Sequence, residues 1–265
     1  VTDVALASGF ASVRRFNALF RERYRMAPSR LRREADGDRS DVLAFELAYR
    51  PPYDFEALLR FLRDRAIAGV ESADEDSYTR TMTVRRGAAT HAGRVTIRHR
   101  ARRRAIGVVV SPSLARVVPA VLGRVRHAFD LAADPGEIGA VLGPLARGHP
   151  GLRLPGTFDG FELAVRAIVG QQVSVKAART LLGRLVAMAG VPLEGAVDGT
   201  GRLFPDADAL AALAPGELAR IGIVATRARA VHALATAVQA GALSLEPGAD
   251  VEATMRALTA IPGVG

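Results

Sequence analysis

After residue 42 the chain shows two patterns in turn: polar and apolar residues alternate, and then apolar residues recur every three or four positions. Every second residue from Leu43 to Tyr49 is apolar or aromatic, which predicts a strand, and Pro51-Pro52 ends it. Apolar residues then recur every three or four positions from Phe55 to Leu62, which predicts a helix. Further strands are expected over Tyr78–Val84, Arg94–Arg98 and Ile106–Val110, and a helix over Val117–Phe129. This pattern predicts a small α+β domain built on an antiparallel sheet.

From about Glu137 onward the strand signal vanishes and helical spacing dominates. Helices are expected over Glu137–Leu145, Phe161–Val169, Val175–Met188, Asp208–Leu213, Thr226–Gln239 and Val251–Leu258. Asp159 and Glu162 form a D-x-x-E capping box ahead of an apolar run, which predicts a helix start there. The second half is therefore predicted to be all-α.

The first 34 residues also follow helical spacing and carry eight arginines against three acidic residues. A short helix, a turn at Gly9 and a longer helix with Ser12 as its N-cap form a helix-turn-helix pattern. Arg14, Arg15 and Asn17 lie off the apolar stripe of the second helix. The alternative is a basic helical hairpin with a solvated face. Residues 35–41 are polar and predict a linker.

The charge of the chain favours one class of binding partner, a polyanion. The net charge is +9, and Lys176 is the only lysine, so 36 − 1 = 35 of the cations are arginine. Arginine binds phosphate through two parallel hydrogen bonds, which favours a polyanion partner, although charge alone does not distinguish nucleic acid from an acidic protein. Residues 80–104 hold nine arginines and no acid, which is typical of a phosphate-binding track or of a solvated hairpin face.

Cysteine usage and hydropathy exclude other classes. The chain has no cysteine, which excludes disulfides, thiolate metal sites and cysteine nucleophiles and fits a reducing cytoplasm. His91 and His99 are isolated, so no metal cluster is expected. No apolar run approaches the ~18 residues that cross a bilayer, so no membrane partner is expected.

Three separated motifs carry a family resemblance: YRPPYDF (residues 49–55), PGLRLPGTFDGFELAVRAIVGQQVS (150–174) and LTAIPGVG (258–265). Their order and intervals resemble those of AlkA-type 3-methyladenine DNA glycosylases, members of the helix-hairpin-helix superfamily. The resemblance implies an AlkA N-terminal-like α+β domain over residues 42–133 and a helical glycosylase domain over 134–265, truncated at the hairpin. It also implies a monomer that hydrolyses the N-glycosidic bond of 3-methyladenine and 7-methylguanine in double-stranded DNA after base flipping.

The resemblance also implies site residues. Gln172 matches the side chain that enters the gap left by a flipped nucleotide, and Phe61 matches an aromatic residue of the base pocket. The predicted hairpin residues that approach a DNA phosphate are Pro262, Gly263, Val264 and Gly265. A helix cap for Gln172, a core position for Phe61 and a plain turn for the hairpin residues are the alternatives.

No catalytic residue is carried over from the family. Its catalytic aspartate follows the hairpin and has no counterpart between Val1 and Gly265, so the chain as given is expected to be inactive. The aspartates of the helical half are predicted to be helix caps or turn residues: Asp159, Asp206, Asp208 and Asp250. No cofactor is expected, and a cation at the hairpin would be structural or would bridge to a phosphate.

The N-terminal segment VALASGFASVRRFNALFRERYRMAPSRLRRE (residues 4–34) resembles the second helix-turn-helix of AraC-type regulators. This resemblance implies a fusion of a transcription-regulator region with a glycosylase, in which Ser12, Arg14, Arg15 and Asn17 contact DNA. The alternative function is a non-catalytic, sequence-specific DNA-binding regulator of AraC/Ada type.

Overall fold

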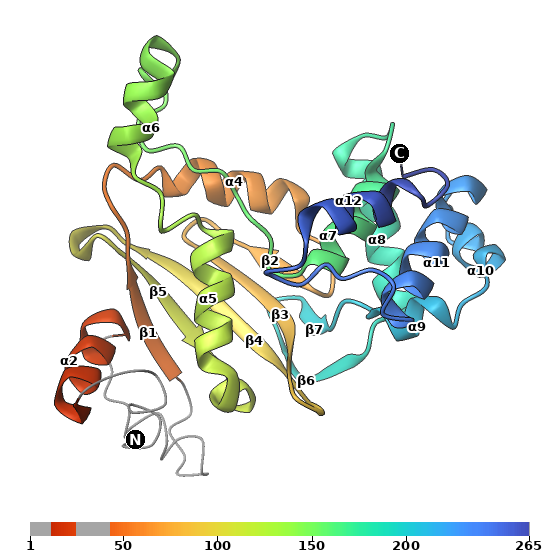
Figure 1. The fold of residues 1–265 in the computed structure, drawn as a ribbon, viewed down its shortest axis with the longest axis horizontal. Coiled ribbons are helices and arrows are strands. Elements are labelled where there is room, and N and C mark those ends of the chain that lie inside the picture. Colours follow the sequence, from red (N-terminus) through yellow and green to blue (C-terminus); the bar gives the residue numbers. More distant parts are fainter. Residues whose placement is uncertain (1–11, 25–42, 265) are drawn as a thin grey trace. The chain divides into compact units, whose positions relative to one another are not determined.

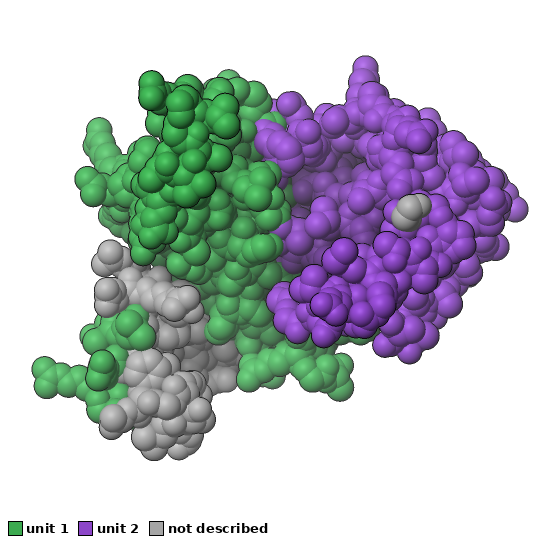
Figure 2. Space-filling model, turned by 45° about the horizontal axis from the view of Figure 1, so that its top comes forward, with its two compact units in different colours: residues 1–60, 74–79, 83–156 green, residues 61–73, 80–82, 157–265 purple. Residues whose placement is uncertain are grey.

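The computed structural model describes residues 12–24 and 43–264 (Figure 1). They fall into two compact units, coloured separately in Figure 2. Unit 1 takes residues 1–60, 74–79 and 83–156, and unit 2 takes residues 61–73, 80–82 and 157–265. The helices in the described part of the chain are all too short or too polar to cross a membrane.

Most of a five-stranded sheet, in the order β1-β5-β4-β3-β2, belongs to unit 1. The strands are β1 (Leu43–Ala48), β2 (Glu71–Ala73), β3 (Ser77–Arg86), β4 (Ala89–Arg100) and β5 (Ala105–Val110). Strand β5 pairs antiparallel with both β1 and β4. Leu43, Phe45 and Leu47 are buried, which confirms that the alternation of β1 marks a core face.

Helices and short 3-10 turns complete unit 1. These are the first half of α4 (Phe55–Arg65), η1 (Ala101–Arg103), η2 (Pro112–Val117), α5 (Val118–Ala128), α6 (Pro135–Leu142) and η3 (Gly143–Ala146). From Phe61 onward, α4 belongs to unit 2. Helix α5 lies over one face of the sheet (Figure 1) and buries Val121, Leu122 and Val125. The α+β domain is therefore confirmed.

Two of the three sequence motifs pack together within unit 1. The buried guanidinium of Arg153 donates to the carbonyl oxygens of Arg50 (2.5 Å) and Pro52 (3.0 Å). The amide of Asp54 donates to the carbonyl of Gly151, and a Cβ at Gly151 would lie 2.6 Å from the backbone of Pro52. These contacts explain why unit 1 continues to Gly156, past the expected boundary at residues 133–134.

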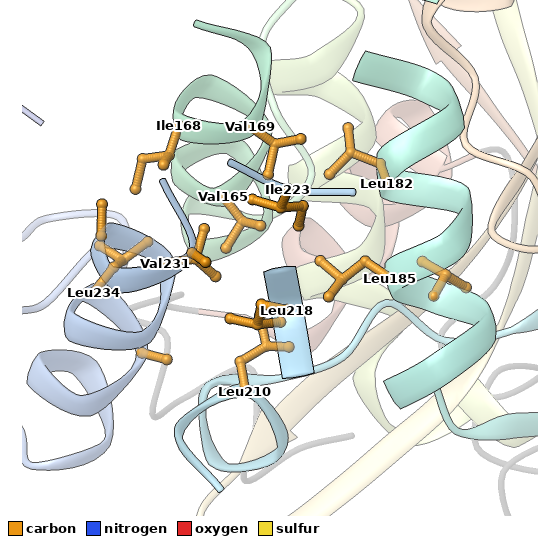
Figure 3. Packing of buried hydrophobic residues seen from close by; sticks show 14 of the residues in the cluster. Val165, Ile168, Val169, Leu182, Leu185, Leu210, Leu218, Ile223, Val231 and Leu234 are labelled. Atoms are coloured by element: carbon orange, nitrogen blue, oxygen red, sulfur yellow. The ribbon is translucent and has the colours of Figure 1, made fainter. Parts of the chain in front are cut away.

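Unit 2 is mainly helical and has its own core. Its helices are α7 (Gly160–Gly170), α8 (Val175–Ala189), α9 (Ala207–Ala211), α10 (Pro215–Arg220), α11 (Ala225–Gln239) and α12 (Val251–Thr259). Figure 3 shows the side chains of Val165, Leu185 and Val231 converging between these helices. The expected helices are present, and the short α10 was not predicted.

Unit 2 also contains strands, which corrects the prediction of an all-α second half. Strands β6 (Pro192–Val197) and β7 (Thr200–Arg202) form an antiparallel hairpin. The connecting residues Asp198 and Gly199 have φ of +49° and +78°. Asp-Gly is a strong signal for such a two-residue turn, but residues 192–197 do not alternate between apolar and polar, and β7 is only three residues long.

Helix α2 (Val13–Tyr24) is the described part of the expected helix-turn-helix. The Ser12 hydroxyl oxygen accepts a hydrogen bond from the Arg15 amide at 3.2 Å, as predicted for an N-cap. Arg14 and Arg15 are exposed, whereas Asn17 is half-buried rather than fully on the solvent side. The preceding helix and the linker lie outside the described residues, so the helix-turn-helix stays a prediction.

Candidate functional site

Helix α7 ends in an exposed turn that carries Gln172. The helix starts at Asp159, whose carboxylate accepts the Glu162 amide at 2.8 Å, and it buries Val165, Ile168 and Val169. Gln172 has φ +51°, in the left-handed region that costs a residue with a Cβ roughly 1–2 kcal/mol. Its side chain is exposed. A strained, exposed polar residue at a helix end is a candidate for function.

A tight turn follows α12 and carries the hairpin residues. The Val264 amide donates to the Ile261 carbonyl at 3.1 Å, and Gly263 has φ +92°, which with Pro262 before it gives the pattern of a type II turn. Pro262 and Gly263 are exposed. Ile261 is buried and Val264 packs against the core, so both anchor the turn. Gly265 lies outside the described residues.

One hydrogen bond joins these two turns within unit 2. The side-chain amide of Gln171 donates to the carbonyl oxygen of Gly263 at 3.2 Å. The bonded residues are 92 positions apart, and they bring together the turns that carry Gln172 and Gly263, which were predicted separately. Gln171 itself was not among the predicted site residues, since only its tertiary contact marks it.

Phe61 lies on α4 with 38% of its surface exposed, whereas Phe55, Leu58 and Leu59 on the same helix are buried. The alternative interpretation of Phe61 as a core residue is therefore wrong. The guanidinium carbon of Arg65 lies 3.8 Å from the centre of the Phe61 ring, a cation–π contact.

The end of α4 is held by arginines of two helices of unit 2. Arg166 of α7 donates to the carbonyl of Arg65 at 3.3 Å, and Arg179 of α8 donates to the carbonyl of Ala66 at 3.0 Å. These bonds fix the backbone just after Phe61 against α7, the helix that ends beside Gln172.

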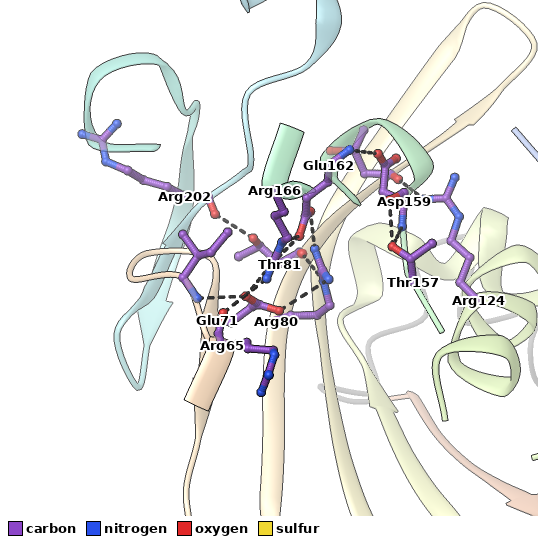
Figure 4. A network of polar contacts seen from close by, with 12 residues as sticks. Arg65, Glu71, Arg80, Thr81, Arg124, Thr157, Asp159, Glu162, Arg166 and Arg202 are labelled. Atoms are coloured by element: carbon purple, nitrogen blue, oxygen red, sulfur yellow. Dashed lines mark hydrogen bonds and ion pairs between the residues drawn. The ribbon is translucent and has the colours of Figure 1, made fainter. Parts of the chain in front are cut away.

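Two buried carboxylates and two arginines form an ion-pair network in unit 2 (Figure 4). The Arg80 guanidinium lies 2.6 Å from Glu162 and 3.7 Å from Glu71, and Arg166 pairs with both carboxylates. Burial acts to raise the pKa of Glu162, but Arg80 and Arg166 outweigh it, so this pKa lies below its ordinary value. The burial of Arg80 corrects the reading of all nine arginines between residues 80 and 104 as one solvated face or phosphate track.

The predicted caps are confirmed at three aspartates. Asp159, Asp206 and Asp250 each accept a backbone amide in the first turn of α7, α9 and α12, respectively. Asp208 lies in the first turn of α9. Within the described ranges, no group of three histidine, aspartate or glutamate residues could hold a metal ion.

An antiparallel sheet domain followed by a helical unit with a glycine turn after its last helix is the architecture of a helix-hairpin-helix base-excision protein. The AlkA N-terminal domain profile matches residues 44–159, and the profile of HhH-GPD superfamily base excision DNA repair proteins matches residues 165–262. The chain is 35% identical over 221 residues to DNA-3-methyladenine glycosylase 2 of Escherichia coli K12, covering 83% of this chain and 76% of that protein. The chain belongs to this family of glycosylases.

A second relative has a longer chain. The sequence is 34% identical over 275 residues to a probable bifunctional transcriptional activator/DNA repair enzyme AlkA of Mycobacterium tuberculosis H37Rv. The match covers 99% of this chain and 54% of the relative, so the chain spans about half the length of that protein.

Solved structures share the fold at low sequence identity. The 3-methyladenine DNA glycosylase of Archaeoglobus fulgidus superposes with a TM-score of 0.67 at 18% identity, covering 83% of this chain and 75% of that one. The protein MBOgg1, solved with a DNA ligand, gives a TM-score of 0.56 at 17% identity, covering 86% of this chain and 74% of that one.

Proposed function

We propose that this chain serves base-excision repair as a DNA-3-methyladenine glycosylase that acts on alkylated purines in double-stranded DNA. The observation that carries this proposal is the hydrogen bond from Gln171 to Gly263. It holds the exposed end of α7 beside the glycine turn, so that one surface of unit 2 offers both a side chain for the DNA stack and a backbone turn for a phosphate.

Gln172 is proposed to enter the duplex where the damaged nucleotide leaves it. Extruding a nucleotide costs a few kcal/mol, and less for a damaged base, so a protein that fills the gap favours the extruded state at lesions. A glutamine can also donate to and accept from the edges of the orphaned base. Pro262 and Gly263, with Val264 and Gly265, are proposed to approach the DNA backbone.

Phe61 is proposed to stack on the damaged base. A purine alkylated at a ring nitrogen is cationic, and the face of Phe61 already accepts the guanidinium of Arg65 at 3.8 Å. A cationic base would take the place of this guanidinium, and the half-buried side chain of Arg65 would turn toward the DNA phosphates.

Replacing Phe61 with alanine is expected to weaken binding to methylated duplex DNA several-fold and to change the melting temperature little. The reason is that Phe61 is exposed and contributes little to the core, whereas a cation–π contact gives about 0.5–2 kcal/mol. Phe55→Ala on the same helix is the matched comparison and should cost about 3–5 kcal/mol of stability, because Phe55 is buried. A large melting shift for Phe61→Ala with unchanged DNA preference would contradict the pocket assignment.

No residue of this chain is proposed as the catalytic carboxylate. Departure of the base builds positive charge on the sugar, and a nearby carboxylate is the family's means of stabilising it. Asp159, Asp206 and Asp250 hold helix amides instead. By resemblance, the family's aspartate follows the hairpin motif, which here is Ile261–Gly265.

The test is to incubate the 265-residue chain with methylated and unmethylated duplex DNA and to measure both binding and released base. We expect tighter binding to the methylated duplex than to the unmethylated one, and any released base is measured against a protein-free control. Equal binding to both duplexes would contradict the proposed function. Release that is lost on replacing one of the capping aspartates with asparagine would contradict only the carboxylate proposal.

A regulatory role of the N-terminal segment is the second candidate. Its support is that the match to the bifunctional Mycobacterium tuberculosis relative covers 99% of this chain and thus takes in that segment. Ser12, Arg14, Arg15 and Asn17 are proposed to contact DNA there. We do not propose the regulator as an alternative to the glycosylase, since the family match covers both main domains.

A further inference from the structure

The face of the sheet opposite the core of unit 1 carries an arginine-walled trough along β5. Two rows of residues cross the three strands β1, β5 and β4 here. One row is Glu46, Gly107 and Arg98, in that order. The other row is Ala48, Ala105 and Arg100. Alternation directs these side chains away from the buried residues Leu43, Phe45 and Leu47 of β1, so they share the outer face. The hollow they line has a volume of about 600 Å³. We call it the β5 trough.

The floor of the β5 trough is low because β5 presents small side chains there. A Cβ at Gly107 would lie 3.1 Å from Nε and 3.3 Å from Cγ of Arg100, so the stem of Arg100 crosses this glycine. Arg98 lies two residues before Arg100 on the same face of β4, and Arg103 of η1 adds a third guanidinium at the rim. The absence of a side chain at Gly107 therefore lets the Arg100 side chain lie along the floor of the β5 trough.

The charges of the β5 trough are only partly neutralised. Arg98 is about half exposed and has Asp76 at 3.9 Å, a long contact with a carboxylate that is itself 81% exposed. Arg103 pairs with Glu46 at 2.6 Å but keeps 70% of its side chain exposed. Three arginines thus face two acids, and the sequence from residue 81 to 104 adds further arginines and no acid. The trough therefore has a net positive charge.

We propose that the β5 trough is a second DNA-contact surface, which binds the phosphodiester backbone of double-stranded DNA regardless of sequence or damage. Arg98 and Arg100 are two residues apart on the same face of β4, so their long side chains can reach neighbouring phosphates along one DNA strand. Guanidinium groups bind phosphates in a two-point geometry, and each contact releases counterions from the duplex. DNA is favoured over an acidic protein because the chain belongs to a family of DNA repair proteins.

The experiment compares the full chain with a triple variant, Arg98→Gln, Arg100→Gln and Arg103→Gln, in binding to an undamaged duplex at several salt concentrations. The matched control is Arg60→Gln, Arg116→Gln and Arg147→Gln, which removes the same charge from exposed positions of unit 1 outside the trough. Melting curves of both variants establish that unit 1 stays folded.

The trough variant should lose about 0.9 in the slope of log K against log [salt] for each phosphate contact removed, hence about 2–3 in total. Its affinity at 100 mM salt should fall on the order of tenfold or more, while the control changes less than about threefold. Equal slopes for the two variants would overturn the proposal. So would an unchanged DNA affinity with lost binding to polyglutamate, which would assign the trough to an acidic protein. Because the duplex is undamaged, neither result depends on the glycosylase proposal.

Discussion

Replacing Arg80 with methionine is expected to lower the free energy of unfolding by about 3–5 kcal/mol, because it removes one partner of a buried ion-pair network. The Arg80 side chain is 5% exposed and lies 2.6 Å from Glu162, whose side chain is 6% exposed. Without Arg80, the buried carboxylates of Glu71 and Glu162 would face each other with only Arg166 between them. Their repulsion and lost solvation are not offset by the apolar methionine.

Urea unfolding of the purified chain measures this loss. The matched control is Arg256→Met, which breaks an ion pair with Glu252 in which the side chains are 73% and 88% exposed. That change should cost less than about 1 kcal/mol, since exposed pairs are screened by water. A similar small loss for both variants would mean that the network contributes no more than a surface pair.

The same network has an expected signature in pH. Because the pKa of Glu162 lies below its ordinary value of 4.5, the folded state gains stability from this group at pH values above 4.5. That gain is lost as the pH falls through the lowered pKa in the folded state. The difference in stability between the wild type and Arg80→Met should therefore shrink below pH 4.5. A difference that stays constant down to the acid transition would contradict the assignment.

Periodicity alone predicted most of the elements, because most of them bury one face; α6 and α12 have no fully buried residue. The three capping aspartates could also be predicted from the sequence, since a cap is a local interaction of residues three positions apart. The hairpin of β6 and β7 was missed although Asp198-Gly199 is a turn signal. Strand β7 is held by a contact that local alternation does not show: the carbonyl oxygen of Gly69 accepts the amides of Gly201 and Arg202.

The sequence contained one sign of the buried ion-pair network, namely the position of Arg80 among apolar residues. Counting Arg80 together with the other arginines of residues 80–104 hid this sign. Arg80 alternates with Tyr78, Met82 and Val84, all buried, so it occupies a core position of β3. An arginine in an apolar register predicts a buried acidic partner. Which acid it pairs with could not be predicted, since Glu162 is 82 positions away and only the tertiary fold brings it near. The hydrogen bond between Gln171 and Gly263 could not be predicted for the same reason, since only the tertiary fold brings these two residues together.

Replacing Gln172 with glycine is expected to abolish the preference of the chain for duplex DNA with a missing base. The wild type should bind a duplex carrying a tetrahydrofuran abasic analogue at least about tenfold more tightly than the intact duplex, because the cost of extruding a nucleotide is already met there. On the proposed function Gln172 enters that gap, whereas a glycine would leave it empty.

Glycine is the informative substitution because it separates function from folding. Gln172 has φ +51°, a conformation that glycine adopts without penalty, so the variant should be as stable as the wild type or more stable by about 1 kcal/mol. Gln239→Ala, at an exposed position at the end of α11, is the matched control and should keep the full preference. Titrations with both duplexes, followed by fluorescence anisotropy, measure the two affinities of each protein. If Gln172→Gly binds the abasic duplex with undiminished preference, the gap is filled by another residue and Gln172 only caps the end of α7.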